Sequence, residues 1–212
     1  MKHLIQSYLL TVMVNSETKI NIIHEHYRET FSVISEAIKR RDRLMLFVVV
    51  ILGFFAFQSI SPILSNQIVT DLLSFKFGLN LKVDLSIIRN VIWAFLLIFS
   101  IRYFQVAVFI ERQYAYIHQL EDKLNKEVGD ELITREGKSY LHEYPWFSNW
   151  ICYLYTLVFP LLLLVVSGYG LVKGFDGMCS MSINEIFDFL IYLLLVISTV
   201  LYLGVIHIKR KK

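Results

Sequence analysis

The chain has 212 residues, of which 56% are hydrophobic, 15% aromatic and only 18% charged, and its formal net charge is +3. A soluble domain of this length rarely has so few charges, and here the charges are almost absent from four long apolar stretches. The composition therefore excludes an ordinary soluble domain, and the lipid bilayer is the main solvent of the predicted fold.

The four apolar stretches cover residues 44–64, 87–108, 150–170 and 187–206. Each approaches the roughly 20 residues that a helix needs to cross a hydrocarbon core about 30 Å thick. We predict an all-α membrane protein with four transmembrane helices and cytoplasmic helical extensions. The predicted regions are a cytoplasmic N-terminal amphipathic helix (1–43), the first two spans with an outer loop at 65–86 (44–108), a cytoplasmic extension and connector (109–149), the last two spans (150–206) and a basic cytoplasmic tail (207–212).

The number of lysine and arginine residues is alternately high and low in successive segments outside the spans. Residues 1–43, 109–149 and 207–212 together hold sixteen, whereas the remaining two loops and the outer edge of the second span hold four, with Arg89 included. Positive residues are retained on the cytoplasmic side of a membrane. We therefore expect both termini and the middle segment to lie in the cytoplasm.

Two amphipathic patterns lie in the predicted cytoplasmic segments. Apolar and aromatic residues recur at helical spacing before the first span, at Ile20, His24, Tyr27, Phe31, Ile34 and Ile38. A similar pattern continues from the second span to Val128, which predicts one long helix that ends at Gly129. Neither segment can bury its apolar stripe alone, so we expect the two to pack together, within one subunit or between subunits.

Three polar or helix-breaking residues inside the spans have both a structural and a functional interpretation. Arg102 either extends its guanidinium to the cytoplasmic face or forms a ring that faces a pore and favours anions. Asp188, close to Glu185, is either solvated at the outer interface or part of a cation-attracting ring. Pro160 is either a gating hinge or an element of static packing.

Two further patterns also have both a structural and a functional interpretation. Phe95 and Phe99 in the second span, with Trp93, either form a hydrophobic gate or contact lipid. The sequence Ser167-Gly168-Tyr169-Gly170 resembles part of a potassium-channel filter, but the preceding residues are long enough to span the membrane and the matching threonine is missing. We favour close helix contact at these small residues.

Basic residues cluster at the predicted cytoplasmic edge of the membrane, at Arg40, Arg41, Arg43, Lys209, Arg210, Lys211 and Lys212. They either anchor the spans among anionic lipids or attract the phosphates of a regulator. His24 and His26 point about 200° apart on a helix and cannot share one metal ion. No arrangement of residues supports catalysis, so we expect no enzyme activity, no cofactor and no metal site.

Three short motifs carry a resemblance to a known group of proteins. They are Arg41-Asp42, the run from Tyr116 to Glu121 (YIHQLE) and the run from Arg135 to Tyr140 (REGKSY). With these motifs the chain resembles small four-span proteins of bacterial anti-phage defence operons, most closely the membrane effector of Hailong-type systems and less closely the membrane protein of Kiwa systems. The resemblance implies a plasma-membrane location in bacteria.

The resemblance also implies an oligomeric, tetrameric ion channel that acts as an anti-phage effector. It implies a nucleotidyltransferase partner whose DNA oligomer product holds the channel closed, or another soluble defence protein in that role. The alternative function is a non-conducting membrane anchor or sensor whose cytoplasmic helices recruit a soluble partner. A small transporter is a more distant alternative, because the sequence has no repeat symmetry.

Overall fold

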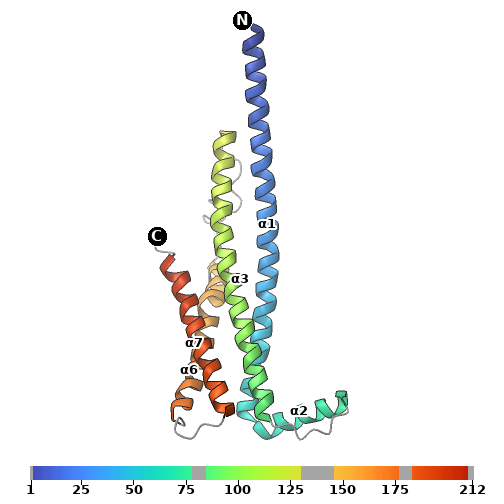
Figure 1. Ribbon diagram of the computed structural model, residues 1–212, viewed down its shortest axis with the longest axis vertical. Helices are drawn as coiled ribbons and strands as arrows, with labels where there is room; N and C mark the ends of the chain where they lie inside the picture. The colour runs from blue at the N-terminus through green and yellow to red at the C-terminus, as the bar shows by residue number, and fades with distance from the viewer. Residues whose placement is uncertain (1, 78–84, 130–145, 177–182, 210–212) are drawn as a thin grey trace. The chain divides into compact units, whose positions relative to one another are not determined.

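The computed structural model describes residues 2–77, 85–129, 146–176 and 183–209. Every element in these ranges is a helix (Figure 1). In chain order the elements are α1 (Lys2–Ile60), α2 (Pro62–Phe77), α3 (Leu85–Val128), α5 (Trp146–Tyr153), the π-helical turn η1 (Leu154–Val158), α6 (Phe159–Asp176) and α7 (Ile183–Lys209). The prediction of an all-α protein is confirmed for this part of the chain.

In the described part of the chain, three helical segments are long and apolar enough to cross a membrane. They are Arg89–Val128 within α3, Trp150–Val172, which runs through η1 into α6, and Ile183–Ile206 within α7. Their length and composition indicate a membrane protein. They coincide with the second, third and fourth stretches that the sequence predicted.

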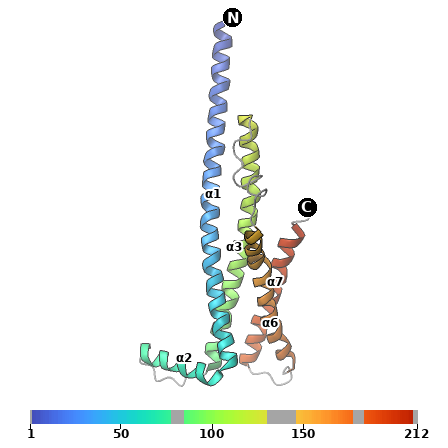
Figure 2. The same ribbon diagram turned by 180° about the vertical axis from the view of Figure 1, so that it is seen from behind.

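The first predicted stretch, 44–64, does not form one uninterrupted helix. Helix α1 ends at Ile60 and α2 begins at Pro62, because the proline ring disfavours a helical conformation at the preceding residue and fits the first position of a new helix. In both views α2 runs across the direction of α3 rather than along it (Figures 1 and 2). Helix α2 therefore includes the end of the first predicted stretch and the beginning of the predicted outer loop 65–86.

Helix α3 is one continuous helix, as its periodicity predicted. It ends at Gly129, whose φ of 79° lies in the left-handed region that favours glycine. The Gly129 amide donates a hydrogen bond to the Asn125 carbonyl at 2.9 Å. The residue therefore closes the last turn of the helix, as expected for a glycine at this position.

The chain divides into two compact units, and α1 and α3 contribute to both. The first unit consists of Met1–Lys39 and Phe109–Cys152. In it, Lys19 forms an ion pair with Glu127, and the Tyr27 hydroxyl donates to Glu121 at 3.2 Å. These contacts join the two segments whose amphipathic patterns were expected to pair, and they do so within one chain.

The buried face of α1 in the first unit differs from the predicted seam. Ile34 is 2% exposed, but Phe31 and His24 are exposed, and the small residues Thr30 and Ala37 are buried instead. The Thr30 hydroxyl bonds back to the His26 carbonyl at 2.7 Å, so this buried polar group is satisfied within its own helix. Four of the six predicted seam residues are buried or partly buried, and only His24 and Phe31 lie off the buried face. Hydrophobic spacing could not show this, because small residues such as Thr30 and Ala37 allow closer contact.

The second unit consists of Arg40–Val108 and Tyr153–Lys212. Helices α6 and α7 lie side by side in it (Figures 1 and 2). Aromatic rings dominate its core. The Trp93 ring packs edge-on against Phe55 at 4.5 Å and against Tyr192 at 4.6 Å, and Phe104 stacks on Tyr202 at 4.3 Å between ring centroids. These contacts link α1, α3 and α7 through side chains with large apolar surfaces.

Candidate functional site

A heptad-spaced stripe of side chains lies exposed on the part of α3 that belongs to the second unit. It consists of Val91, Phe95, Ile98, Arg102 and Gln105, which follow one another at alternating spacings of four and three residues. We call these five residues the α3 stripe. The Arg102 guanidinium donates a hydrogen bond to the Gln105 side chain at 3.2 Å, so the two polar members of the stripe bind each other.

The polar residues distinguish the α3 stripe from the exposed faces of the other apolar helices. Among the α6 side chains that the structure describes, the exposed ones are Leu161, Leu162, Val165, Tyr169, Val172 and Phe175. In α7 between residues 189 and 206, and in the apolar part of α1 described between residues 44 and 58, every exposed residue is apolar. Faces of that kind suit contact with lipid tails, whereas an exposed arginine and glutamine do not.

The residues predicted as a pore or gate do not lie together. Phe95 and Arg102 belong to the α3 stripe, but Phe99 is half-buried and stacks on Phe95 at 6.1 Å and on Phe47 of α1 at 5.4 Å. Pro160 is buried in α6. Phe95 and Arg102 are therefore available for contact on the exposed face of α3, and Phe99 is not.

Asp188 is buried and forms an ion pair with Arg89, with 3.1 Å between the carboxylate and guanidinium atoms. Beside this pair, the amide groups of Asn90 and Asn184 approach to 3.5 Å. The four side chains join the first two turns of α3 and α7. A carboxylate that is neutralised within its own chain attracts cations less than the free carboxylate considered from the sequence.

The motif Ser167–Gly170 lies inside the continuous helix α6. The Ser167 hydroxyl donates to the Leu163 carbonyl at 2.6 Å, and a Cβ added to Gly170 would lie 2.8 Å from the Tyr192 ring. Its backbone is therefore engaged in helix formation, and Gly170 provides the close helix contact that we favoured.

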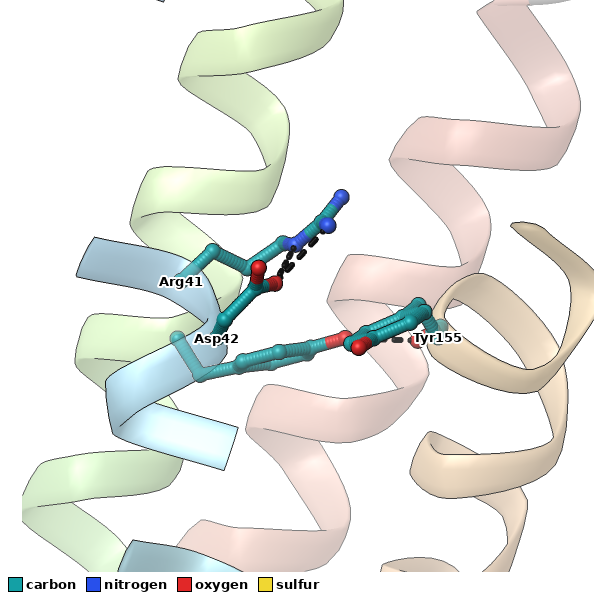
Figure 3. Close-up of polar contacts among 4 residues, drawn as sticks. Arg41, Asp42 and Tyr155 are labelled. Atoms are coloured by element: carbon teal, nitrogen blue, oxygen red, sulfur yellow. Dashed lines mark hydrogen bonds and ion pairs between the residues drawn. The ribbon is translucent and has the colours of Figure 1, made fainter. Parts of the chain in front are cut away.

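A second polar cluster surrounds Tyr155 in η1 (Figure 3). The Arg41 guanidinium lies over the Tyr155 ring, 4.4 Å from its centroid, and donates to one oxygen of Asp42 through Nε at 3.1 Å and through Nη2 at 2.9 Å. The Tyr103 hydroxyl donates to the backbone carbonyl of Tyr155 at 2.7 Å. Helices α1 and α3 thus both contact one residue of the π-helical turn.

The remaining basic residues of the predicted regulatory surface have more open surroundings. Arg40 and Arg43 are exposed, whereas Arg41 is half-buried by its contact with Tyr155. Lys209 is the last residue of α7, and residues 210–212 lie outside the described part of the chain. Among the basic residues of this surface whose side chains the structure describes, Arg40 and Arg43 are exposed to a phosphate, and the side chain of Lys209 lies outside that description.

The sequence analysis missed Arg89, Tyr103 and Tyr155. A partial signal was present for Tyr155 alone, because a proline at position 160 leaves one backbone carbonyl of the preceding turn without an amide donor. The sequence places Arg89 at the outer edge of the second span, and its partner could not be identified from spacing because Asp188 lies in a different helix.

Among the described residues, no group of three or more His, Cys, Asp and Glu side chains could hold a metal ion. No protein-family model, curated protein or solved structure matches the chain.

Proposed function

We propose that the protein is a homo-oligomeric membrane channel in which the α3 stripe lines the ion pathway. The observation that carries this proposal is the exposure of Arg102 and Gln105 on a helix that is apolar enough to span a membrane. A charge placed against lipid tails near the centre of a helix costs about 2.5–3.5 kcal/mol or more. A water-filled axis between copies of the chain removes that cost.

The same stripe contains the parts of a gate and of an ion filter. A ring of Arg102 side chains from several copies would attract anions, so we propose a preference for anions over cations. Ile98 and Phe95 lie about one and two helical turns from Arg102, respectively, and rings of such apolar side chains can close a pore by excluding water. The alternating spacing of four and three residues suits packing between identical helices, for which we propose a tetramer.

For the membrane arrangement we propose four spans, with α1 providing the first. Its apolar part, 44–60, has 17 residues, or about 26 Å at 1.5 Å per residue, close to the lower limit for a span. The lysine and arginine distribution supports a cytoplasmic location for both termini and for the segments 1–43 and 109–149.

Reconstitution tests the proposal. The purified oligomer, placed in a planar bilayer between unequal KCl solutions, should carry current. Its reversal potential should be shifted from zero toward the equilibrium potential of chloride. Arg102→Gln should shift that potential toward zero, whereas Arg28→Gln, the same change at an exposed arginine of the first unit, should not. A confirmed oligomer without current above that of a protein-free bilayer would instead assign the chain to the anchor or sensor class.

The physiological role that we propose follows from the resemblance to Hailong-type effectors. Opening of the channel during phage infection would depolarise the cell, and a soluble regulator would act on the cytoplasmic segments, where Arg40 and Arg43 are exposed. A membrane-potential dye should report depolarisation of infected cells that carry the protein with its neighbouring defence genes. Cells with the Arg102→Gln variant should depolarise less.

A further inference from the structure

The third candidate span contains a π-helical turn at Leu154–Val158. The amide of Phe159 donates to the carbonyl of Leu154, five residues earlier, where an α-helix would use the carbonyl of Tyr155. The turn therefore holds one residue more than an α-helical turn. Such turns are rare within α-helices and frequently lie at functional sites.

The turn leaves the carbonyl of Tyr155 without an amide donor from its own helix. Its α-helical donor would be Phe159, which donates to Leu154. Its π-helical donor would be residue 160, which is proline and has no amide hydrogen. A backbone carbonyl in a nonpolar interior needs a partner, because leaving it unsatisfied is costly.

The partner comes from another helix. Tyr103 of α3 is fully buried and donates its hydroxyl to the Tyr155 carbonyl at 2.7 Å, while its ring packs edge-on against Phe159 at 4.8 Å between centroids. The Tyr155 ring lies under the Arg41 guanidinium of α1, which is itself held by Asp42 (Figure 3). Tyr155 is thus fixed through its backbone by α3 and through its ring by α1.

Because of Pro160, two hydrogen-bond registers leave the same number of carbonyls without a helical donor. In the observed π register the Tyr155 carbonyl lacks a helical donor and Tyr103 supplies one. In an α register Phe159 would donate to Tyr155, and the carbonyl of Thr156 would lack its donor, because that donor would again be residue 160. Each register therefore leaves one carbonyl to be satisfied from outside the helix, and neither is favoured by its count of backbone hydrogen bonds.

We infer that residues 154–160 form a two-register hinge, and that the Tyr103 hydroxyl holds it in the π register. Loss of the extra residue from the turn would rotate the preceding residues relative to α6 by about 100°, the angle between successive residues of an α-helix. The Tyr155 ring would then leave Arg41. The hinge does not rest on the proposed function, but in a channel it would give α1 and α3 joint control over the third span.

Hydrogen exchange of the detergent-solubilised full-length protein tests the hinge. In Tyr103→Phe the amides of peptides covering residues 154–160 should exchange at least about tenfold faster, because the π register loses the hydrogen bond that satisfies a buried carbonyl. Tyr192→Phe, the same change in α7, should leave their exchange within about twofold of the wild type. Exchange in Tyr103→Phe within that same range would overturn the inference.

A second variant separates the hinge from general loss of packing around Tyr103. Pro160→Ala restores an amide, so that Tyr155 can be satisfied by its own helix in either register. In the Pro160→Ala background, Tyr103→Phe should change exchange by less than about twofold, even if Tyr103→Phe alone does not fold. A tenfold effect of Tyr103→Phe in both backgrounds would show that Tyr103 only fills space, and would overturn the inference. Neither result depends on whether the protein conducts ions.

Discussion

At the scale of single residues, several polar side chains within the apolar helices form hydrogen bonds or ion pairs in the same chain. Asp188 binds Arg89, Ser167 and Thr199 donate to carbonyls of their own helices, and Arg102 binds Gln105. In each case a group that is costly in hydrocarbon gains a hydrogen bond. Arg102 differs from the buried examples because its partner leaves it exposed, and for this reason it carries the functional proposal.

Removal of Arg89 should show that its role is to neutralise Asp188. Arg89→Ala is expected to destabilise the protein by about 1–2 kcal/mol, less than for a fully buried pair because the Arg89 side chain is 38% exposed. Asp188→Asn should recover part of that loss in the Arg89→Ala background, because a neutral amide needs no counter-charge. Thermal unfolding in detergent, followed by tryptophan fluorescence, measures both effects. Strictly additive losses would contradict the pairing.

At the scale of helices, prolines and glycines decide where helices end, bend and approach one another. Pro62 separates α2 from α1, Gly129 closes α3, Pro160 follows the π-helical turn, and Gly170 admits the Tyr192 ring. The helix ends at Pro62 and Gly129 have local causes and could be predicted from sequence, but only the end at Gly129 was predicted. The π-helical turn could not be predicted, because it also depends on Tyr103, which lies 52 residues from Tyr155 in the sequence.

A matched pair of glycine variants tests the contact between α6 and α7. Gly170→Ala should destabilise the protein by about 1–3 kcal/mol, because the new Cβ would lie 2.8 Å from a Tyr192 ring that already packs on Trp93. Gly168→Ala meets nothing within 4 Å and should be neutral or stabilising by up to about 1 kcal/mol, because alanine is the better helix former. Thermal midpoints that fall equally in the two variants would argue against the close contact.

At the scale of the whole molecule, each unit encloses its own buried side chains. The first unit joins residues of α1 and α3 through Ile34, Ile117, Leu120 and Leu124 and through two polar contacts, and the second has the aromatic core around Trp93. The polar residues of the α3 stripe, Arg102 and Gln105, remain exposed on an apolar helix and are not enclosed by the rest of the chain. We propose that association of copies through the face that carries this stripe supplies a suitable environment for them.

Cross-linking tests whether copies of the chain associate through the α3 stripe. In a background with Cys152 and Cys179 changed to serine, Ile98→Cys should form disulfide-linked dimers in membranes under mild oxidation, because Ile98 lies on the stripe and is 53% exposed. Val165→Cys, on the apolar face of α6 and 68% exposed, should stay monomeric under the same conditions. Non-reducing electrophoresis measures both. Efficient linkage at position 165 but not at 98 would place a different helix at the interface between copies.

The sequence by itself determined the helical class, three of the apolar spans, the continuity of α3 and its end at Gly129, because these depend on composition, periodicity and local backbone preferences. Only the tertiary structure decided which side chains meet. It placed Thr30 and Ala37 rather than Phe31 and His24 on the buried face of α1, paired Asp188 with Arg89, and brought Tyr103 to the carbonyl that Pro160 leaves unsatisfied. Hydrophobic spacing shows that a helix has a buried face, but contacts between distant segments depend on the geometry with which helices pack.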